Sequence, residues 1–498
     1  MVVLSTRPKS PPHTPLTEVA ARLGLATDAD TVVTGLTLST QRVQPGDLYA
    51  ALPGTRAHGA DFATDAVASG AVAILTDETG RAAASAAGVP VLVVPEPRAV
   101  LGALAAFLYG DPGRALTLMA VTGTQGKTTT TRLLEAGLEQ AGIPAAVVGT
   151  VGTRIAGEDV KTALTTPEAP DLQALFAVMR EQGVRGCTLE VSSHALVLGR
   201  VDGVVFDVAA FANLGRDHLD FHADVEEYFA AKASLFTPLR ARLGLTNVDD
   251  PYGRRLLTIA GIPMRTFSPS GEPADWRAVD VVLEPEGSRF TVVTPAGDRI
   301  PARVPVAGAF NVANGLCAIA LAAEAGFDPA VVAAGIAEGP GVPGRLERVD
   351  AGQDFLAVVD YAHKPDALEA ALAAIRPLTT GRVLLVVGAG GDRDTGKRPL
   401  MGEIGARLAD VLVVTDDNPR SEDPAAIRAA ILAGAEGPAE VVEVGGRDAA
   451  IRYAVGLAGP GDTVLVAGKG HETGQEIAGE THPFDDRVEL RLAIEEAR

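Results

Sequence analysis

Residues 119–135, MAVTGTQGKTTTTRLLE, constrain the fold of this chain more than any other segment. They predict an apolar strand, a glycine-containing turn and a helix, an order of elements that forms a cradle for a nucleotide phosphate. Gly123 and Gly126 let the backbone close on the phosphate, and Lys127 can reach the terminal phosphates. We therefore expect nucleotide binding. The fate of the phosphate stays open at this point: release to drive motion, transfer to an acceptor, or activation of an acid.

The spacing departs from the general phosphate-loop pattern G-x-x-x-x-G-K-[ST], because Val121 stands where the first glycine belongs. The loop is therefore a shortened variant of the phosphate loop. The alternative is an ordinary strand-to-helix turn that binds no nucleotide. The remaining residues of the expected nucleotide-binding turn are Thr124, Gln125, Thr128 and Thr129. A threonine hydroxyl at this place can ligate Mg²⁺.

Length and composition predict several domains. The 498 residues are too many for one core, and the 47% hydrophobic and 21% charged residues suit a packed globular enzyme. Segments rich in Pro and Gly at 111–115 and 337–349 suggest boundaries. We predict an α/β protein of three domains: an N-terminal α/β domain (1–112), a central domain with a phosphate-loop-like parallel sheet (113–340) and a C-terminal Rossmann-like doubly wound domain (341–498).

Charge and cysteine content exclude several classes of protein. The formal net charge of −20 argues against non-specific nucleic-acid binding. Cys187 and Cys317 are too few for a disulfide framework or a zinc cluster. No secretory signal precedes the first domain, and no apolar run approaches the ~20 residues that span a bilayer. We expect a cytoplasmic protein without membrane insertion.

Short strands and helices alternate through most of the chain. Pro-rich residues 8–15 are expected to form a mobile tail, and residues 279–295 an antiparallel hairpin. In the C-terminal region the polar residues at predicted strand ends are Asp360, Gly391, Asp417 and Lys469. Doubly wound sheets bind ligands at that edge, so these residues mark a candidate site.

Two polar clusters follow strands of the central region. Glu190 ends one strand, where a Mg²⁺ ligand is expected. The adjacent Ser192, Ser193 and His194 could suggest a hydrolase, but no G-x-S-x-G elbow surrounds them. Polar packing and helix capping are the alternative role of these three side chains.

The second cluster lies in FANLGRDHLDFH, residues 211–222. His218 stands beside Asp217 and Asp220, which favours a metal role over a purely structural one. Lys232 follows in a predicted helix among Ala, Leu and Phe, and by pattern alone it is a surface lysine that extends its ammonium into solvent.

Nine motifs occur in one order between residues 122 and 472, within a match that spans about residues 36–490: TGTQGKTTT, EVSSHAL, NLGRDHLDFH, GAFNVANGLCAIA, GPGVPGRLE, VVDYAHKPDALEAAL, GGDRDTGKRPLMG, DDNPRSEDP and AGKGHE. Together they resemble the Mur ligases, the ATP-dependent amide ligases of peptidoglycan precursor synthesis. The resemblance is greatest to the branch that adds the third residue of the peptide, 2,6-diaminopimelate.

The resemblance implies a reaction. ATP activates the D-Glu γ-carboxylate of UDP-N-acetylmuramoyl-L-alanyl-D-glutamate as an acyl phosphate, and the amine of meso-2,6-diaminopimelate displaces phosphate. L-Lysine, L-ornithine and LL-diaminopimelate remain alternative amino acids. Mg²⁺ is the implied cofactor, and a monomer is expected. The other hypotheses are a motor or regulatory ATPase, an inactive nucleotide-binding scaffold and a folylpolyglutamate synthetase.

The resemblance also implies residue roles. Lys127, Lys232, His218 and Arg345 match catalytic positions, and Thr128, Glu190, His218 and Lys232 (as a carbamate) match metal ligands. ATP-binding positions beyond the loop are Asn311, Asn314, Arg345, Asp360 and His363. Positions for the UDP-sugar dipeptide are Leu38, Thr40, Thr55, Arg56, Ala57, Thr165, Thr166, Ser192 and Arg200.

Selection of the amino acid has a physical argument of its own. Diaminopimelate differs from lysine by a carboxylate at the far end, and an arginine fork binds a carboxylate through two hydrogen bonds. Arg420 and Arg393 each follow a predicted strand; a solvated Asp/Arg loop is the alternative. The resemblance completes this site with Asp417, Asn418, Pro419, Gly468 and Glu472.

The sequence departs from the family pattern at three places. Ser39, Thr40 and Gln41 replace D-S-R near the uridine side. Gln125 replaces an Asn of the phosphate loop, and Leu198 stands where some relatives place a Gln. The first departure makes the uridine contacts the least certain part of the prediction.

Overall fold

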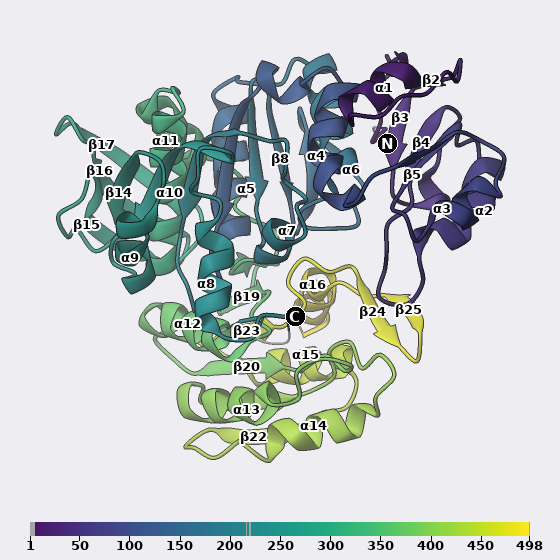
Figure 1. Ribbon diagram of the computed structural model, residues 1–498. Helices are drawn as coiled ribbons and strands as arrows, with labels where there is room; N and C mark the ends of the chain where they lie inside the picture. Colours follow the sequence, from purple (N-terminus) through teal and green to yellow (C-terminus); the bar gives the residue numbers. More distant parts are fainter. Residues whose placement is uncertain (1–4, 216, 219–220, 498) are drawn as a thin grey trace. The chain divides into compact units, whose positions relative to one another are not determined.

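The structure, a computed structural model, describes residues 5–215, 217–218 and 221–497 (Figure 1). The chain forms two compact units, the first from residues 1–131, 138–266 and 321–328, the second from residues 132–137, 267–320 and 329–498. These units cut the chain differently from the three predicted domains, whose boundaries stay a prediction. None of the helices in the described ranges combines the length and apolar character needed to cross a bilayer.

The N-terminal part of the first unit is a four-stranded parallel sheet. Its strands, in spatial order, are β3 (Gly35–Thr37), β4 (Asp47–Ala50), β5 (Ala73–Thr76) and β6 (Val91–Val93). Leu48 packs into the cluster beneath α1 (Leu16–Arg22) and α4 (Pro97–Leu108). Tyr49 points to the other face, where α2 (Ala63–Ala68) and α3 (Arg81–Ser85) lie (Figure 1). This alternation is what period-two side-chain direction produces when both faces are covered.

The Pro-rich N-terminal segment is fixed to the first unit, so the predicted mobile tail is wrong. Arg7 donates hydrogen bonds to Asp47 (3.1 Å) and to Tyr109. The backbone N–H groups of Lys9 and Ser10 donate to Glu181 (2.8 and 2.9 Å), and β1 (Thr14–Pro15) pairs with β2 (Val32–Val33). The prolines of this segment lack a backbone N–H, but the N–H groups of Lys9 and Ser10 and the side chain of Arg7 still donate hydrogen bonds.

The central sheet of the first unit contains the predicted strand–turn–helix. Its strands, in spatial order, are β10 (Glu158–Val160), β9 (Gly152–Ile155), β8 (Ala145–Gly149), β11 (Gly186–Glu190), β7 (Thr117–Thr122), β12 (Phe206–Phe211) and β13 (Ala241–Asn247). β7 runs parallel to β11 and β12 and is almost wholly buried, as its continuous apolar sequence predicted. The helices of this region are α5 (Lys127–Gln140), α6 (Ala169–Glu181), α7 (Ser193–Val197), α8 (Val225–Ala233) and α9 (Pro251–Ile259).

The second unit begins with a run of strands and two helices. β14 (Met264–Ser268), which starts in the first unit, pairs at Phe267 with β15 (Trp276–Glu284). β15 pairs antiparallel with β16 (Gly287–Val293), which confirms the hairpin predicted for residues 279–295. β17 (Arg299–Val304), α10 (Ala309–Glu324) and α11 (Pro329–Glu338) follow.

The doubly wound sheet of the second unit positions the C-terminal candidate residues. Its order is β18 (Glu347–Arg348), β19 (Leu356–Asp360), β23 (Thr463–Ala467), β20 (Val383–Val387), β21 (Val411–Val414) and β22 (Glu440–Glu443). All neighbours are parallel except β18–β19. Because β23 comes last in sequence yet lies between β19 and β20, the segment after it meets the ends of strands from earlier in the chain.

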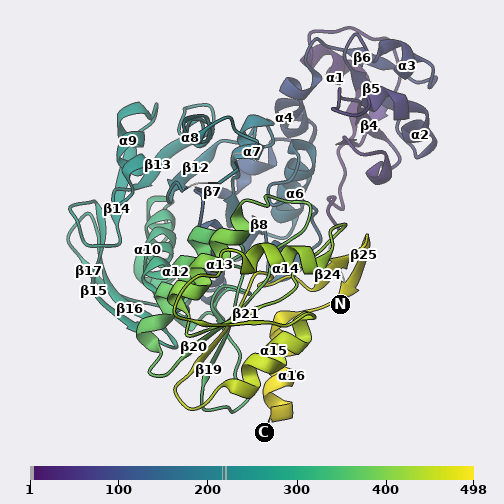
Figure 2. The same ribbon diagram turned by 90° about the horizontal axis from the view of Figure 1, so that it is seen from below.

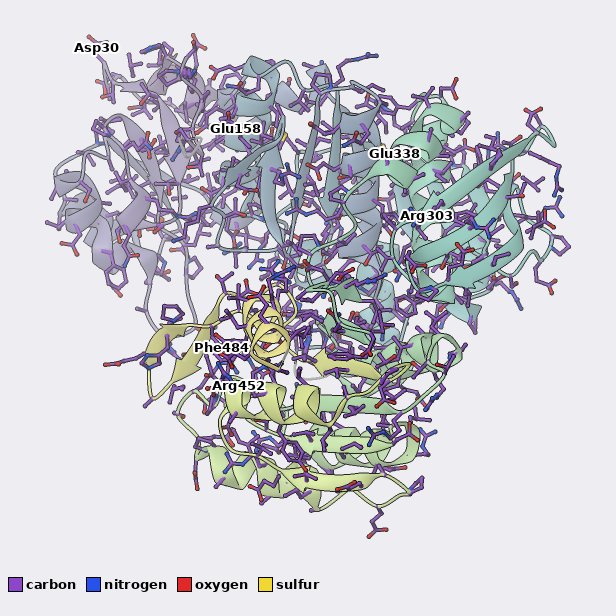
Figure 3. The ribbon with its side chains drawn as sticks, turned by 180° about the vertical axis from the view of Figure 1, so that it is seen from behind. Asp30, Glu158, Arg303, Glu338, Arg452 and Phe484 are labelled. Atoms are coloured by element: carbon purple, nitrogen blue, oxygen red, sulfur yellow. The ribbon has the colours of Figure 1, made fainter. Side chains whose placement is uncertain are left out.

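Helices cover both faces of this sheet (Figure 2). One face carries α12 (Pro365–Ile375), α13 (Lys397–Leu408) and α14 (Pro424–Leu432); the other carries α15 (Arg447–Leu457) and α16 (Asp486–Ala497). On α15, Arg452 contacts Glu496 of α16 at 2.9 Å, and Phe484 packs against the core beneath these two helices (Figure 3). The hairpin β24 (Gly474–Ile477) and β25 (Glu480–Pro483) precedes α16. The predicted α/β class with a parallel central sheet and a doubly wound C-terminal sheet is confirmed.

Candidate active site

The phosphate loop curls around the ammonium group of its own lysine. Gly123 and Gly126 have φ angles of +157° and +83°, values that glycine adopts without steric cost. The Nζ of Lys127 donates to the carbonyl oxygens of Gly123 (2.8 Å) and Thr124 (3.1 Å). The loop therefore holds one positive charge at the start of α5, where the helix dipole is also positive.

A side chain from the end of β12 braces this loop. The backbone N–H of Gln125 donates to Oδ1 of Asn213 (2.9 Å), and Nδ2 of Asn213 donates back to the Gln125 carbonyl (3.2 Å). The N–H of Thr124 donates to the Asn213 carbonyl (3.0 Å). Asn213 belongs to the NLGRDHLDFH motif, but no role was predicted for it from sequence.

Lys232 is buried next to the phosphate loop, so the surface position predicted from pattern alone is wrong. Its Nζ donates to the Gly123 carbonyl (2.8 Å) and lies 4.5 Å from the ring centre of Tyr228. The Tyr228 hydroxyl in turn lies 3.2 Å from the Thr124 hydroxyl. Burial raises the pKa of Tyr228, so its hydroxyl stays neutral. Lys232 therefore contacts the loop and does not extend its ammonium into solvent.

Glu190 ends β11 in register with Val121 of β7, two residues before Gly123. Its side chain is buried, and its two oxygens accept hydrogen bonds from the N–H (2.8 Å) and the hydroxyl (3.0 Å) of Thr150. A buried carboxylate beside a phosphate loop provides the hard oxygen ligand that Mg²⁺ prefers. Thr128 is a buried residue in the first turn of α5, and its hydroxyl group is also a hard oxygen ligand.

The remaining predicted metal ligand, His218, lies in a segment with an uncommon backbone. His218 has a φ of +54°, its ring lies 3.3 Å from Asp217, and its centroid lies 4.8 Å from that of His194. Asp220, named with it in the sequence analysis, lies outside the described residues. Among the described residues, no three His, Cys, Asp or Glu side chains form a ready cluster for a metal. The oxygen atoms of Glu190 and Thr128 are suitable ligands for Mg²⁺, but the described side chains do not form a complete coordination site.

The residues that precede α6 form one polar network with residues that end or follow β8, β11 and α7. The Thr166 hydroxyl donates to the Glu190 carbonyl (2.8 Å), and the Thr165 and Thr150 hydroxyls lie 3.2 Å apart. Arg200 contacts the Glu168 carboxylate (2.9 Å) and donates to the Thr166 carbonyl (3.4 Å). The structure thus gathers several residues predicted for the sugar-nucleotide dipeptide.

The hydrolase alternative finds no support at Ser192. Its hydroxyl accepts the N–H of Ala195 (3.2 Å) and caps α7, and Ser193 contacts the ring of His222 (3.0 Å). Capping is therefore the observed role of this serine.

The other predicted sugar-nucleotide residues lie in the N-terminal region. Leu38 follows β3, and Thr40 begins a short 3₁₀ helix (Thr40–Arg42). Thr55, Arg56 and Ala57 form an exposed bend. Their role stays a prediction.

In the second unit, three residues predicted to bind ATP lie near the end of β19: Arg345, Asp360 and His363. The guanidinium carbon of Arg345 lies 4.6 Å from the ring centre of Tyr361, a cation–π contact. Asp360 accepts the N–H groups of Leu346 (2.7 Å) and Ala362 (2.8 Å). Burial raises the pKa of the Asp360 carboxyl, and the charge of Arg345 opposes this shift.

His363 is held neutral in the same region. Burial lowers its pKa to about 4, and the nearby cations Lys364 and Lys397 act in the same direction. Its Nδ1 lies 2.7 Å from the Tyr361 carbonyl. Elsewhere in this unit, Asn314 donates to Asn311 (2.9 Å), which itself donates to the Ala307 carbonyl (2.7 Å).

The predicted amino-acid site centres on Arg420, at a φ of +53°. Its Nη1 donates to the Gly391 carbonyl (2.6 Å), and its Nε lies 3.2 Å from the Glu476 carboxylate. The Arg420 N–H also donates to the Glu476 carbonyl (3.0 Å). The hairpin β24–β25 therefore fixes the direction of this guanidinium.

A second charged group faces the site from the segment after β23. Glu472 accepts hydrogen bonds from Asn418 (2.9 Å) and from the buried Lys469 (3.1 Å), which also donates to Oδ1 of Asn418 (3.0 Å). Lys469 was predicted from sequence as a strand-end residue of a candidate site, without a specific role. Of the other predicted members, Asp417 lies against Gly468 and the Pro419 carbonyl lies against Gly391, whereas Arg393 is exposed.

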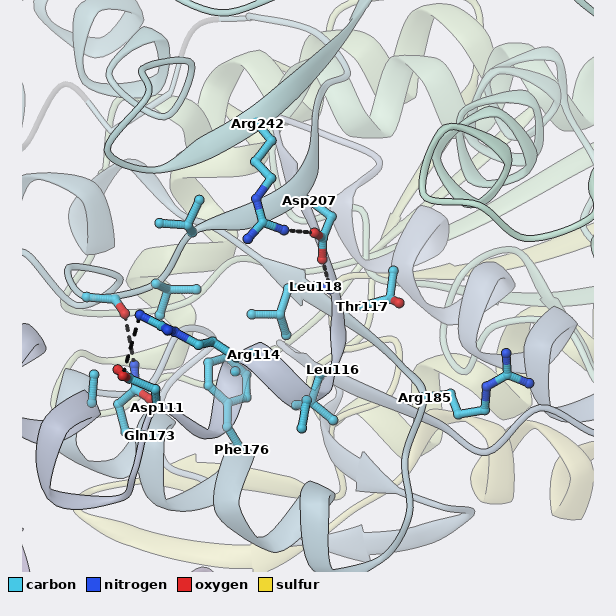
Figure 4. Close-up of a pocket in the computed structure, with 16 residues that line it drawn as sticks. Asp111, Arg114, Leu116, Thr117, Leu118, Gln173, Phe176, Arg185, Asp207 and Arg242 are labelled. Carbon is cyan, nitrogen blue, oxygen red and sulfur yellow. Dashed lines mark hydrogen bonds and ion pairs between the residues drawn. The ribbon is translucent and has the colours of Figure 1, made fainter.

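A separate cavity of about 740 Å³ lies at the opposite edge of the central sheet of the first unit (Figure 4). Its lining includes Thr117, where β7 begins, whereas the phosphate loop follows the other end of that strand. Arg242 points at Asp207, and Arg114 lies 3.6 Å from Asp111 (Figure 4). None of the predicted site residues lines this cavity.

Fold and site together define an α/β protein with a phosphate loop in one sheet and a cluster of charged side chains at the strand ends of a second, doubly wound sheet. Three family models match the chain: "Mur ligase family, catalytic domain" over residues 32–109, "Mur ligase middle domain" over 121–322 and "Mur ligase, glutamate ligase domain" over 344–470. The chain belongs to the Mur ligase family.

Three known proteins illustrate this relationship. The chain is 58% identical to UDP-N-acetylmuramoyl-L-alanyl-D-glutamate–2,6-diaminopimelate ligase from Streptomyces avermitilis, over 99% of each chain. A solved structure of a ligase with the same name shares 33% identity and a TM-score of 0.69, and the match covers 97% of this chain and 99% of that one. MurF ligase from Thermotoga maritima in complex with ADP shares the fold, with 18% identity, a TM-score of 0.64 and coverage of 93% and 97%.

Proposed function

We propose that this chain is the ATP-dependent ligase that joins meso-2,6-diaminopimelate to the D-Glu γ-carboxylate of UDP-N-acetylmuramoyl-L-alanyl-D-glutamate. It would act as a monomer in the cytoplasm, in peptidoglycan precursor synthesis, without nucleic-acid partners. The 58% identity to the Streptomyces ligase over nearly the whole of both chains supports this reaction.

One observation supports the choice of amino acid most directly: the pocket after β21 and β23 presents two opposite charges. Arg420 offers a fork for a distal carboxylate, and Glu472, already oriented by Lys469 and Asn418, offers oxygen for a distal ammonium. Lysine has only the ammonium, so it would make no hydrogen bond to the Arg420 guanidinium. Discrimination then follows from the charge-assisted hydrogen bonds that only diaminopimelate makes.

Each unit offers its own predicted residues for ATP. In the first unit the N–H groups of the phosphate loop and Lys127 would contact the phosphates. In the second unit Asn311 and Asn314 are proposed for the base and ribose, and Arg345, Asp360 and His363 for the phosphate side. The ADP bound to the Thermotoga maritima relative supports nucleotide binding by this fold.

Mg²⁺ would be held by oxygen ligands beside the phosphate loop, namely Thr128 and Glu190, with His218 and a carbamylated Lys232 completing the set. When bound, the ion neutralises part of the charge on the transferring phosphoryl group. Carbamylation of Lys232 would consume CO₂ and convert its ammonium into an anion.

The reaction proceeds in two displacements. The γ-carboxylate attacks the γ-phosphorus of ATP, the bond to ADP breaks and an acyl phosphate forms. The deprotonated amine of the amino acid then attacks the acyl carbon, and inorganic phosphate leaves from the tetrahedral intermediate. Lys127 and Arg345 stabilise the negative charge that develops on the phosphoryl oxygens. Thr165, Thr166, Ser192 and Arg200 would position the dipeptide next to the phosphate loop.

Omission of each substrate in turn tests this function. Phosphate release is measured from ATP with the UDP-sugar dipeptide and diaminopimelate, and the tripeptide product is identified by mass spectrometry. We expect release to require both co-substrates. Release from ATP alone would contradict the ligase and favour a motor or regulatory ATPase.

A further inference from the structure

A buried ion pair lies below the amino-acid pocket and has no role in the reaction described above. The guanidinium of Arg447 contacts the carboxylate of Asp486 through two hydrogen bonds, Nε to Oδ1 and Nη2 to Oδ2, each 2.7 Å long. Both side chains are 0% exposed. Burial of two charges costs free energy of folding. A buried pair therefore suggests that one of its side chains also makes contacts that the fold or the site requires.

The position of Arg447 opposes its local helical environment. It is the first residue of α15, where the positive end of the helix dipole disfavours a cation. Asp486, at the start of α16, is favoured by the same effect. Because the helix N-terminus disfavours a cation, the presence of Arg447 there indicates that a tertiary contact requires its guanidinium.

That contact is with the ends of two strands. Nη1 of Arg447 donates to the Asp416 carbonyl (3.2 Å) and Nη2 donates to the Ala467 carbonyl (2.9 Å). The residues that follow these carbonyls are Asp417 and Gly468, both predicted to bind the amino acid. One guanidinium therefore ties together the two segments that form the pocket.

These segments belong to strands that are not neighbours, because β20 separates β21 from β23. The chain after β21 crosses the end of β20 at Gly388, where a Cβ atom would lie 2.7 Å from the Thr415 carbonyl oxygen. At the far side of the crossing, a Cβ on Gly468 would lie 2.5 Å from Oδ2 of Asp417. The two glycines permit the close approach, and Arg447 holds it from below.

Asp416 is fixed on its other side as well. Its carboxylate accepts the N–H of Gly446 (2.9 Å) and pairs with Arg428. Its carbonyl therefore has little freedom to leave Arg447.

We propose that Arg447, anchored by Asp486, is a positioning residue that sets the separation between segment 416–420 and segment 467–472. It thereby fixes the distance between Arg420 and Glu472, and with it the affinity for an amino acid that carries a charged pair at its far end. This inference rests on the proposed function.

The test compares Arg447→Lys and Asp486→Asn with the wild type. Arg447→Lys keeps the charge but cannot donate to three partners in one plane, and Asp486→Asn keeps the shape but removes the anion. We expect the KM for diaminopimelate to rise about 10- to 100-fold, because small misplacements of binding groups cost this much. The kcat and the KM for ATP should stay within about threefold of wild type, and the preference for diaminopimelate over lysine should shrink.

Asp462→Asn is the matched control for lost stability. Asp462 is also buried and paired with an arginine, Arg382 (2.8 Å), but it precedes β23 at the opposite edge of the same sheet. We expect it to lower the melting temperature and to leave the KM for diaminopimelate unchanged. If Arg447→Lys and Asp486→Asn behave like this control, the positioning role is wrong.

Arg428→Gln decides the question if neither variant folds. It loosens Asp416 without touching the buried pair, and we expect a severalfold rise in the same KM. An unchanged KM would overturn the proposal. Failure of the proposed function is recognised separately, because the wild-type protein itself would then not use diaminopimelate.

Discussion

The phosphate loop of the first unit and the amino-acid pocket of the second are built in opposite ways. The loop uses backbone groups from one continuous turn, residues 123–129, with Lys127 folded back onto it. The pocket uses charged side chains from segments some fifty residues apart, such as Asn418 and Glu472. Ligand binding by backbone groups should be sensitive only to substitution of the few side chains that shape the turn. Ligand binding by charged side chains should be sensitive to the loss of each charge.

Lys232→Ala should have the largest effect in this comparison, because it removes the buried side chain that contacts the Gly123 carbonyl and that is proposed, as a carbamate, to bind Mg²⁺. We expect kcat/KM to fall about 100- to 1,000-fold, the range for loss of one group that stabilises charge in a closed site. Excess bicarbonate should not restore the activity. Lys161→Ala, which alters an exposed lysine, is the control. Activity within twofold of wild type in Lys232→Ala would remove this residue from the site.

Arg420→Ala tests the side-chain half of the comparison. It leaves a substrate carboxylate without its charged partner, at about 2–3 kcal/mol, or roughly 30- to 150-fold in kcat/KM for diaminopimelate. Binding of ATP, measured by calorimetry, should not change. Arg393→Ala is the comparison variant, and because its guanidinium is exposed we expect a smaller loss. Equal losses in both variants would contradict the central place given to Arg420.

Asn213→Ala tests whether side-chain bracing of the loop is secondary to its backbone. The variant removes two hydrogen bonds with Gln125, and we expect the KM for ATP to rise about tenfold, from about 1–1.5 kcal/mol. The KM for diaminopimelate is the internal control and should stay constant. A loss as large as that of Lys232→Ala would mean that the loop has no stable shape of its own.

His363 gives the smallest effect, on stability alone. Its pKa falls from about 6.5 in the unfolded chain to about 4 in the fold, so between these values the unfolded chain binds more protons. Stability is therefore lost as pH falls through this window, by about 2 kcal/mol between pH 7.5 and 5. The melting temperature of wild type should fall roughly 4–8 °C more than that of His363→Gln over this range. Parallel pH profiles for the two proteins would show that His363 does not titrate in this way.

The elements that depend on residues close together in the sequence could be predicted from it. The strand–turn–helix at 119–135 and the hairpin at 279–295 each rest on neighbouring residues, and the structure has both. The Rossmann-like sheet followed from apolar runs that parallel strands require.

Contacts between distant segments could not be predicted in this way. The apolar neighbours of Lys232 did not reveal that its helix packs on the phosphate loop 109 residues away. Asn213 braces a turn 88 residues earlier, and Arg447 pairs with Asp486 39 residues later. The amino-acid pocket itself was predicted mainly from the family resemblance, because no single segment contains both of its charges.

The most direct test of the account compares kcat/KM for meso-diaminopimelate, LL-diaminopimelate, L-lysine and L-ornithine with the UDP-sugar dipeptide and ATP held constant. Opposed charges at Arg420 and Glu472 predict that meso-diaminopimelate exceeds L-lysine and L-ornithine by about 100-fold or more. A preference for L-lysine or L-ornithine would keep the ligase reaction but contradict the assignment of Arg420 to the distal carboxylate.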